Sequence, residues 1–214
     1  MNLDVSEVFN SIQAEGRYTG VPVVFLRLQK CTRNCSFCDT QYHKVGKSVS
    51  IVSLAKQLSK QPLRTIVITG GEPLLQWEGI VELWRVLNKD KHFNIHLETN
   101  GDLLYNKKVT YAEVLGVCSY VAISPKEVKI ARQLYKDLPG PLSKGMCDVK
   151  VVTDINTTGG SMIPFATILM PLTTCNVDRD IINRKKVWEY CTKNGIRYSP
   201  RLHVELFGAQ QRGV

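Results

Sequence analysis

Apolar positions along the chain gather in short runs rich in β-branched residues, separated by longer segments that mix apolar and polar residues. Runs of about four to eight such residues, bounded by polar or turn-forming residues, are typical of buried β-strands, because helices need longer segments. We therefore predict six strands, over residues 21–28, 64–69, 93–98, 120–124, 148–153 and 166–171.

Between these strands, apolar residues recur at helical spacing. Residues 50–60, 74–90 and 181–195 repeat apolar positions three or four apart, and Gly195 is a typical helix stop signal. Strands that alternate with helices indicate βα units, and strands that are apolar on both faces are typical of a parallel sheet. The pattern predicts an α/β fold.

Polar stretches follow the first four predicted strands at their C-terminal ends. In chain order they are "CTRNCSFCDT", "GGEP", "TNG" and "PKE". In α/β barrels this edge of the sheet carries the active site, so four such stretches favour an enzyme or a ligand-binding barrel. Because 214 residues is short for eight βα units, we predict one domain, residues 1–214, containing an incomplete, open β/α barrel of about six parallel strands.

Composition narrows the location of the protein. No apolar run approaches the roughly 20 residues needed to span a bilayer. The N-terminal stretch "MNLDVSEVFNSIQAEG" also lacks the basic start and apolar stretch of a signal peptide. We expect a cytoplasmic protein with no membrane contact.

The chain is basic, with 28 Lys and Arg against 19 Asp and Glu and a net charge of +9. This charge favours acidic partners, such as an anionic substrate or an acidic electron donor. The basic residues are dispersed, so binding to nucleic acid is a weak prediction.

Three of the seven cysteines, Cys31, Cys35 and Cys38, form a CxxxCxxC motif. In a reducing compartment such clustered cysteines are metal ligands or catalytic groups more often than disulfides. Structural zinc normally takes four ligands, and the chain has no second CxxC pair. Three thiolates on a 4Fe–4S cluster leave one iron open for a substrate or cofactor. The remaining cysteines are isolated and are expected to be small buried residues.

The cysteine motif, with the aromatic Phe37 before its last cysteine, is similar to the signature of radical S-adenosylmethionine (SAM) enzymes. "GGEP", residues 70–73, resembles the glycine-rich motif of that superfamily, in which exposed backbone and the Glu72 carboxylate receive the methionine amino group. Glycine permits close backbone approach, and an amine needs an anionic acceptor.

Within this superfamily the chain resembles the 7-carboxy-7-deazaguanine synthase family nearly from end to end. The matching motifs are "SIQAEG", "FLRL", "CDTQY", "TGGEPLLQ", "ETNG", "SPK" and "SPRLHVELFG", in this order. The resemblance implies a radical-mediated ring contraction of 6-carboxy-5,6,7,8-tetrahydropterin to 7-carboxy-7-deazaguanine with loss of ammonia, a step in the biosynthesis of queuosine and other 7-deazapurines.

The resemblance also implies the cofactor sites. The three motif cysteines would hold the 4Fe–4S cluster. The SAM site would be lined by Phe37, Cys38, Asp39, Gly71, Glu72, Glu98, Ser124, Pro125 and Lys126. For Ser124 and Lys126 the alternative is a strand end with a lysine whose stem lies along the surface.

For the substrate and metal, the resemblance assigns Arg27 to the pterin carboxylate and Thr40 to Mg²⁺. Magnesium takes few protein ligands, so one hydroxyl is sufficient; the alternative for Thr40 is a plain turn. The other implied substrate contacts are Ile12, Gln13, Ala14, Glu15, Thr69 and His203. The alternatives are an exposed loop before the first strand for Gln13 and Glu15, and a structural role for His203.

Two residues depart from the family pattern, since Ala14 and Lys30 stand where glycine is usual. Both predict a backbone adjustment, because glycine tolerates conformations that other residues do not. A glutamine expected before the proline of "ILMPLTT" is also missing.

Two other functions remain open from the sequence. One is a different radical SAM enzyme, such as an activase that forms a glycyl radical on a partner protein. The other is a basic zinc-binding module for nucleic acid. The family resemblance further implies a flavodoxin or ferredoxin as the electron donor and a homodimer.

Overall fold

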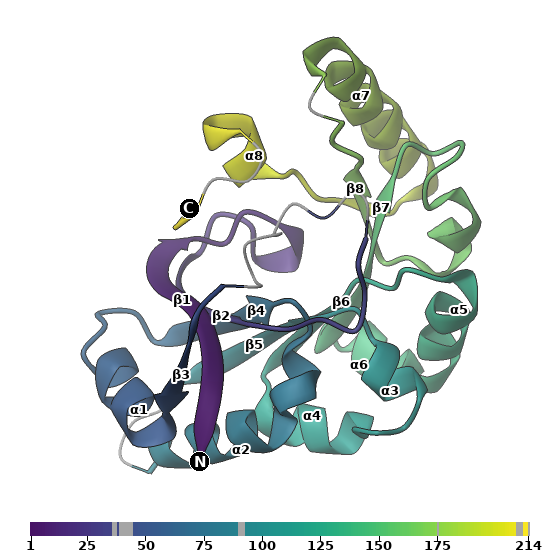
Figure 1. Ribbon diagram of the computed structural model, residues 1–214. Coiled ribbons are helices and arrows are strands. Elements are labelled where there is room, and N and C mark those ends of the chain that lie inside the picture. The colour runs from purple at the N-terminus through teal and green to yellow at the C-terminus, as the bar shows by residue number, and fades with distance from the viewer. Residues whose placement is uncertain (36–37, 39–44, 90–92, 175, 209–211, 214) are drawn as a thin grey trace.

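The computed structural model of the chain describes residues 1–35, 38, 45–89, 93–174, 176–208 and 212–213. Within them one sheet has the strand order β3-β1-β2-β4-β5-β6-β7-β8-β9 (Figure 1). All six predicted strands are present, and a seventh short strand extends the parallel part. The parallel strands are β2 (Pro22–Leu28), β4 (Thr65–Gly70), β5 (Asn94–Thr99), β6 (Tyr120–Ile123), β7 (Cys147–Thr153), β8 (Ile168–Pro171) and β9 (Arg197–Tyr198).

The sheet is curved but open. Its two end strands, β3 (Lys47–Ser50) and β9, are not paired with each other in the described part of the chain. The open, incomplete barrel predicted from the sequence is therefore confirmed.

The N-terminal segment differs from the prediction, because residues before the first predicted strand form a long strand of their own. β1 (Asn2–Ile12) runs antiparallel to β2 and carries β3 on its other side. Gln13 and Ala14, directly after it, are buried. The alternative of an exposed loop at this point is wrong.

The predicted helices are present as α1 (Ile51–Ser59), α2 (Trp77–Leu87) and α7 (Val177–Asn194), and Gly195 ends α7 with a φ of 66°. Ser50 caps α1 by accepting a hydrogen bond from the Ser53 amide. The other helices are α3 (Asp102–Tyr105), α4 (Tyr111–Val117), α5 (Val128–Asp137), α6 (Pro139–Ser143) and α8 (Leu202–Phe207), with 3₁₀ turns at Gly16–Tyr18, Pro73–Gln76 and Gly160–Phe165.

The main hydrophobic core lies between the sheet and the helices on its outer side, where α1, α2, α4 and α5 are seen in Figure 1. Leu54 and Leu58 of α1 and Ile80 and Leu83 of α2 are buried there. Each fully buried side chain of this size contributes roughly 1.5–3 kcal/mol. The opposite, concave face carries polar side chains together with apolar ones such as Phe25 and Met170.

The concave face is covered in part by the segment after β1 and by the residues that lead into α8. The Leu202 amide donates to the Ala14 carbonyl at 3.1 Å, and the Gly16 amide donates to Ser199 Oγ at 2.7 Å. Arg17 makes two hydrogen bonds to the Asp148 carboxylate, at 2.7 and 2.9 Å. The two ends of the chain therefore meet over the same cavity. No helix among the described residues is both long and apolar enough to cross a membrane.

Candidate active site

A cavity of about 230 Å³ opens at the carboxyl ends of the parallel strands. Its walls come from β2, β4, β5, β7 and β8 and from the residues that follow β1 and β6, as the strand-end motifs predict. Of the predicted site residues that the structure describes, those that line it are Ile12, Gln13, Ala14, Glu15, Arg27, Cys31, Cys35, Cys38, Thr69, Gly71, Glu98, Ser124, Lys126 and His203.

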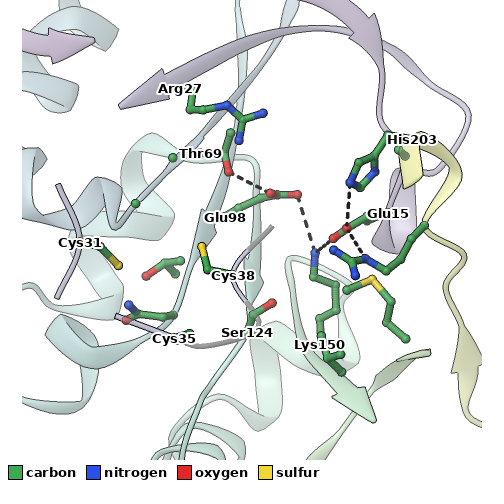
Figure 2. A pocket seen from close by; sticks show the side chains of 18 of the residues that line it. Glu15, Arg27, Cys31, Cys35, Cys38, Thr69, Glu98, Ser124, Lys150 and His203 are labelled. Atoms are coloured by element: carbon green, nitrogen blue, oxygen red, sulfur yellow. Dashed lines mark hydrogen bonds and ion pairs between the residues drawn. The ribbon is translucent and has the colours of Figure 1, made fainter. Parts of the chain in front are cut away.

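The three motif cysteines line one side of this cavity and are partly exposed (Figure 2). The Cys38 amide donates to the Cys35 carbonyl at 3.2 Å, which holds these two cysteines close together. Partial burial raises the pKa of the Cys31 thiol. Phe37, Asp39 and Thr40, predicted for SAM and Mg²⁺, lie outside the described residues.

The other described cysteines, Cys118, Cys147 and Cys191, are buried in the hydrophobic clusters. Their expected role as small core residues is confirmed, while Cys175 lies outside the described residues.

Gly70 and Gly71 bring the end of β4 against the backbone that leads into the cysteine loop. A Cβ at Gly70 would lie 2.1 Å from the Leu28 carbonyl oxygen, and one at Gly71 would lie 1.9 Å from that of Lys30. Gly70 also has a φ of 134°. Only glycine permits this approach. The glycine pair therefore fixes how the cysteine loop leaves β2, in addition to lining the cavity.

Glu72 is not among the residues that line the cavity. It is fully buried and accepts hydrogen bonds from the Leu74 amide (3.0 Å), Thr99 Oγ1 (2.7 Å) and the Asn100 amide (2.8 Å). Burial raises its pKa to about 7 despite these donors. Through these bonds Glu72 joins β4 to the end of β5, and its contact with the SAM amino group stays a prediction.

A buried ionic cluster lies across the cavity from the cysteines (Figure 2). Lys150 Nζ lies 2.6 Å from Glu15 Oε2, and Arg201 Nε lies 3.3 Å from Glu15 Oε1. His203 Nε2 is 3.9 Å from the same oxygen. Burial alone would raise the pKa of Glu15, but Lys150, Arg201 and His203 outweigh it and hold that pKa well below its usual range. Glu15 is therefore an anion at neutral pH.

Glu98 lies between the cysteines and this cluster. Its carboxylate accepts hydrogen bonds from Gln13 Nε2 and Thr69 Oγ1, each at 3.1 Å, and lies 3.9 Å from Lys150 Nζ. Residues predicted for the substrate (Gln13, Glu15, Thr69) and for SAM (Glu98) are thus brought into one network.

Arg27 lies on the cavity wall and pairs with Glu7 in the middle of β1. Its Nε donates to Glu7 Oε1 at 2.7 Å, and its guanidinium lies 5.6 Å from the centre of the Phe9 ring. Glu7 therefore orients the guanidinium from the neighbouring strand.

Ser124, Pro125 and Lys126 follow β6. The Ser124 amide donates to the Thr99 carbonyl at 2.8 Å. Burial lowers the pKa of Lys126. Ser124 and Lys126 line the cavity, whereas Pro125 is not among the lining residues.

Comparison with known proteins assigns the superfamily. The family model described as "Radical SAM superfamily" matches residues 26–137, just over half of the chain. The chain belongs to the radical SAM superfamily. Members of this superfamily use a 4Fe–4S cluster and SAM. Three thiols that face one cavity fit such a cluster, because each thiolate binds a different iron and the sulfurs need not converge on one point.

Two curated relatives of this radical SAM protein carry the name 7-carboxy-7-deazaguanine synthase. The protein of Bacteroides thetaiotaomicron is 40% identical over 97 residues, which are 45% of this chain and 51% of the relative. That of Rickettsia prowazekii is 32% identical over 169 residues, 76% of this chain and 66% of the relative. The chain spans about half the length of the first curated relatives it matches.

A solved structure described as the crystal structure of QueE from Escherichia coli shares the fold. It has a TM-score of 0.56 and 20% sequence identity, and the match covers 94% of each chain.

Four charged residues in or near the cavity of this radical SAM protein were not among the predicted site residues. They are Glu7, Arg33, Lys150 and Arg201. Lys150 could have been predicted as a site residue, because it stands in the middle of the predicted strand 148–153 and a charge buried in a strand must find a partner. Arg201 lies in the matched "SPRLHVEL" motif. Glu7 could not have been predicted, since β1 was not expected.

The backbone adjustment expected at Lys30, where the family usually has glycine, is present. Lys30, next to Cys31, has a φ of 67°, a conformation that costs a residue with a Cβ about 1 kcal/mol. Ala14 is not among the non-glycine residues with positive φ.

We expect Lys30→Gly to be more stable than Lys30→Ala by about 1 kcal/mol in urea denaturation. Both variants lose the ion pair with Asp4, so equal stability would show that this conformation carries no cost.

His96 gives the protein a sensitivity to acid. Its ring is buried against Tyr18 and Tyr120, and its Nδ1 has no hydrogen-bond partner in the described part of the chain. Burial lowers its pKa to about 4, against the influence of Glu98. Below pH 6.5 the unfolded chain takes up a proton that the folded ring refuses, so stability falls as the pH drops towards 4.

We expect the lowered pKa of His96 to reduce the free energy of unfolding by about 2 kcal/mol at pH 4 relative to pH 7.5, after allowance for solvent screening. His96→Phe should therefore gain stability relative to the unsubstituted protein between pH 7.5 and pH 4, as measured by urea denaturation at each pH. A constant difference between the two proteins across this range would contradict the assignment.

Proposed function

We propose that this radical SAM protein is a carbon–nitrogen lyase that converts 6-carboxy-5,6,7,8-tetrahydropterin to 7-carboxy-7-deazaguanine and ammonia. The observation that carries the proposal is one cavity with three thiols on one side and a cluster of charged and amide side chains on the other. The names of the curated relatives support the same reaction.

Cys31, Cys35 and Cys38 would hold the 4Fe–4S cluster, with one iron left for SAM. When bound, the cluster and SAM supply the radical chemistry that starts the ring contraction. The chain's own residues bind and orient the reactants. The sheet and the segment over its concave face limit the access of water, which protects reactive species from side reactions.

The SAM site would use the Gly71 backbone and the Glu98, Ser124 and Lys126 side chains, all on the cavity wall. Pro125 would act through its backbone shape only. Phe37 and Asp39 keep their proposed places from the sequence motif. Glu72 keeps its proposed contact with the SAM amino group and also fixes the end of β5.

The substrate would lie between Arg27 and the ionic cluster. The Arg27 guanidinium, oriented at Nε by Glu7, would pair with the pterin carboxylate. Glu15, held ionised by Lys150 and Arg201, would accept hydrogen bonds from the N–H groups of the ring. Thr69, Gln13 and His203 supply further polar contacts, and Ile12 and Ala14 complete the wall.

Magnesium is a further element of the proposal, with Thr40 as its protein ligand and the substrate carboxylate and waters completing the oxygen shell. We expect Thr40→Ala to lower activity and to weaken its dependence on added Mg²⁺, while iron content stays the same. Titration of both proteins with Mg²⁺ after treatment with a chelator checks this. An unchanged Mg²⁺ dependence in the variant would exclude Thr40 as the ligand.

The partners follow from charge and fold. A net charge of +9 supports an acidic electron donor of the flavodoxin or ferredoxin class. A homodimer is proposed from the family resemblance, and the open sheet leaves edges that a second copy could cover.

The function is tested by anaerobic turnover of the reconstituted protein with the tetrahydropterin, SAM and a reductant, with the product identified by mass spectrometry. We expect 7-carboxy-7-deazaguanine. Cleavage of SAM by a fully loaded protein that leaves the pterin intact would favour another radical SAM reaction.

A further inference from the structure

The loop between the first two motif cysteines is tied to the turn that follows β5. Arg33 donates through Nε to Asp102 Oδ2 at 2.8 Å and through Nη2 to Asp102 Oδ1 at 2.6 Å. Thr32 Oγ1 donates to Asp102 Oδ2 at 2.8 Å, and Asn100 Nδ2 donates to Thr32 Oγ1 at 2.9 Å. Two consecutive loop residues are therefore held by one turn.

This turn, residues 99–102, is itself fixed from below. Thr99 Oγ1 and the Asn100 amide donate to the two oxygens of Glu72. The Asp102 amide donates to Asn100 Oδ1 at 2.9 Å, and Gly101 between them has a φ of 81°. A Cβ at Gly101 would lie 2.9 Å from Ile123 Cγ2. These contacts fix the turn to the sheet independently of its contacts with the cysteine loop.

The contacts form a continuous path through three of the strand-end motifs. It runs from Glu72 in "GGEP", through the turn after β5, to Arg33 in the cysteine motif. The first link, from Thr99 to Glu72, joins residues 27 positions apart in the chain, and the last, from Arg33 to Asp102, joins residues 69 positions apart. Such long-range contacts fix the loop to the sheet, because local contacts within the loop cannot do so.

We propose that Arg33 and Asp102 are positioning residues that hold the cysteine loop in the geometry needed to keep the cluster. The inference rests on the proposed role of the three cysteines but not on the identity of the substrate. Neither residue binds iron in this proposal. Their effect is to limit the conformations of the loop, so that its thiols face the cavity before the cluster is present.

Of the two carboxylates that pair with Arg33, Asp102 contributes more than Glu127 to holding the cysteine loop in place. Arg33 Nη2 also donates to Glu127 Oε1 at 2.7 Å, but the Glu127 side chain is 40% exposed against 11% for Asp102. Exposed ion pairs contribute little because water screens them. Hydrogen bonds to Asp102 and Glu127 raise the pKa of Arg33, so its charge is constant over any practical pH.

The test compares Asp102→Asn with the matched control Glu127→Gln. Both substitutions remove the negative charge of a carboxylate that pairs with Arg33. Only Asp102→Asn also places an NH₂ group, in place of an acceptor oxygen, against the donors of Thr32 and Arg33. Each protein is reconstituted anaerobically, and the loss of iron to a coloured chelator is followed with time. Far-UV circular dichroism and thermal unfolding check that the fold is retained.

We expect Asp102→Asn to lose its cluster about tenfold faster than the unsubstituted protein, and Glu127→Gln to lose it less than about threefold faster. In the cluster-free proteins, the thiols of Asp102→Asn should also react faster with iodoacetamide. Cluster loss from Asp102→Asn at the unsubstituted rate would overturn the proposal, as would equal effects of the two substitutions.

Arg33→Lys provides a second variant if Asp102→Asn does not fold. It keeps the charge but cannot make the paired hydrogen bonds, so we expect it to lose the cluster faster as well, and an unchanged rate would overturn the proposal. These readouts are separate from turnover. A protein that shows the expected rates but makes no 7-carboxy-7-deazaguanine would refute the proposed reaction and leave the positioning role intact.

Discussion

Replacing Lys150 by methionine is expected to lower the free energy of unfolding by about 3 kcal/mol, the largest single effect on stability that we predict. Lys150 is 4% exposed and lies 2.6 Å from Glu15 and 3.9 Å from Glu98. Without it, the carboxylates of Glu15 and Glu98, whose side chains are 14% and 24% exposed, lose a shared positive charge. Burial would lower the pKa of Lys150, but the two glutamates raise it instead, so the lysine is charged in the folded protein.

Urea denaturation of the Lys150→Met protein measures this loss, with Lys30→Met as the control. Lys30 also pairs with an acid, Asp4 at 2.7 Å, but its side chain is 67% exposed. Its replacement should cost less than about 1 kcal/mol. Equal losses in the two variants would mean that the buried cluster does not stabilise the fold.

The second large effect concerns the cluster. Cys35→Ala removes one of three proposed iron ligands, and we expect it to bind no stable cluster and to lose all measurable turnover. Cys118→Ala is the matched control, because Cys118 is 2% exposed and lies in the hydrophobic core. This control should keep its iron and activity and lose only about 1 kcal/mol of stability.

Iron and sulfide analysis of the reconstituted proteins, with their visible absorbance, checks both variants. A Cys35→Ala protein with a full cluster and normal turnover would contradict the assignment of the motif. Loss of iron from Cys118→Ala while its fold is intact would also contradict it, because a core cysteine should have no part in the cluster.

Six of the seven described parallel strands could be predicted because each is largely buried and leaves a short, mainly apolar run in the sequence, whereas the two-residue β9 leaves none. β1 could not be predicted in this way. Its buried residues Leu3 and Val5 alternate, but the register shifts between Val5 and Glu7. A bulge of this kind breaks the period of two on which a strand prediction depends.

The residue types of the site could be predicted from the strand ends, but their partners could not. Lys150 and Glu15 are 135 positions apart, and Arg27 meets Glu7 only because β1 lies beside β2. Glu72 is the clearest case. Its motif predicts a ligand contact, yet the fold satisfies its carboxylate with three donors of its own.

The central claim is the ring contraction, and it is tested most directly by measuring three quantities in one anaerobic incubation of the reconstituted protein with the tetrahydropterin and SAM. These are the pterin consumed, the 7-carboxy-7-deazaguanine formed and the ammonia released. Because the product differs from the substrate by one ammonia, the account predicts equal amounts of all three. Consumption of SAM with neither pterin loss nor ammonia release would contradict it.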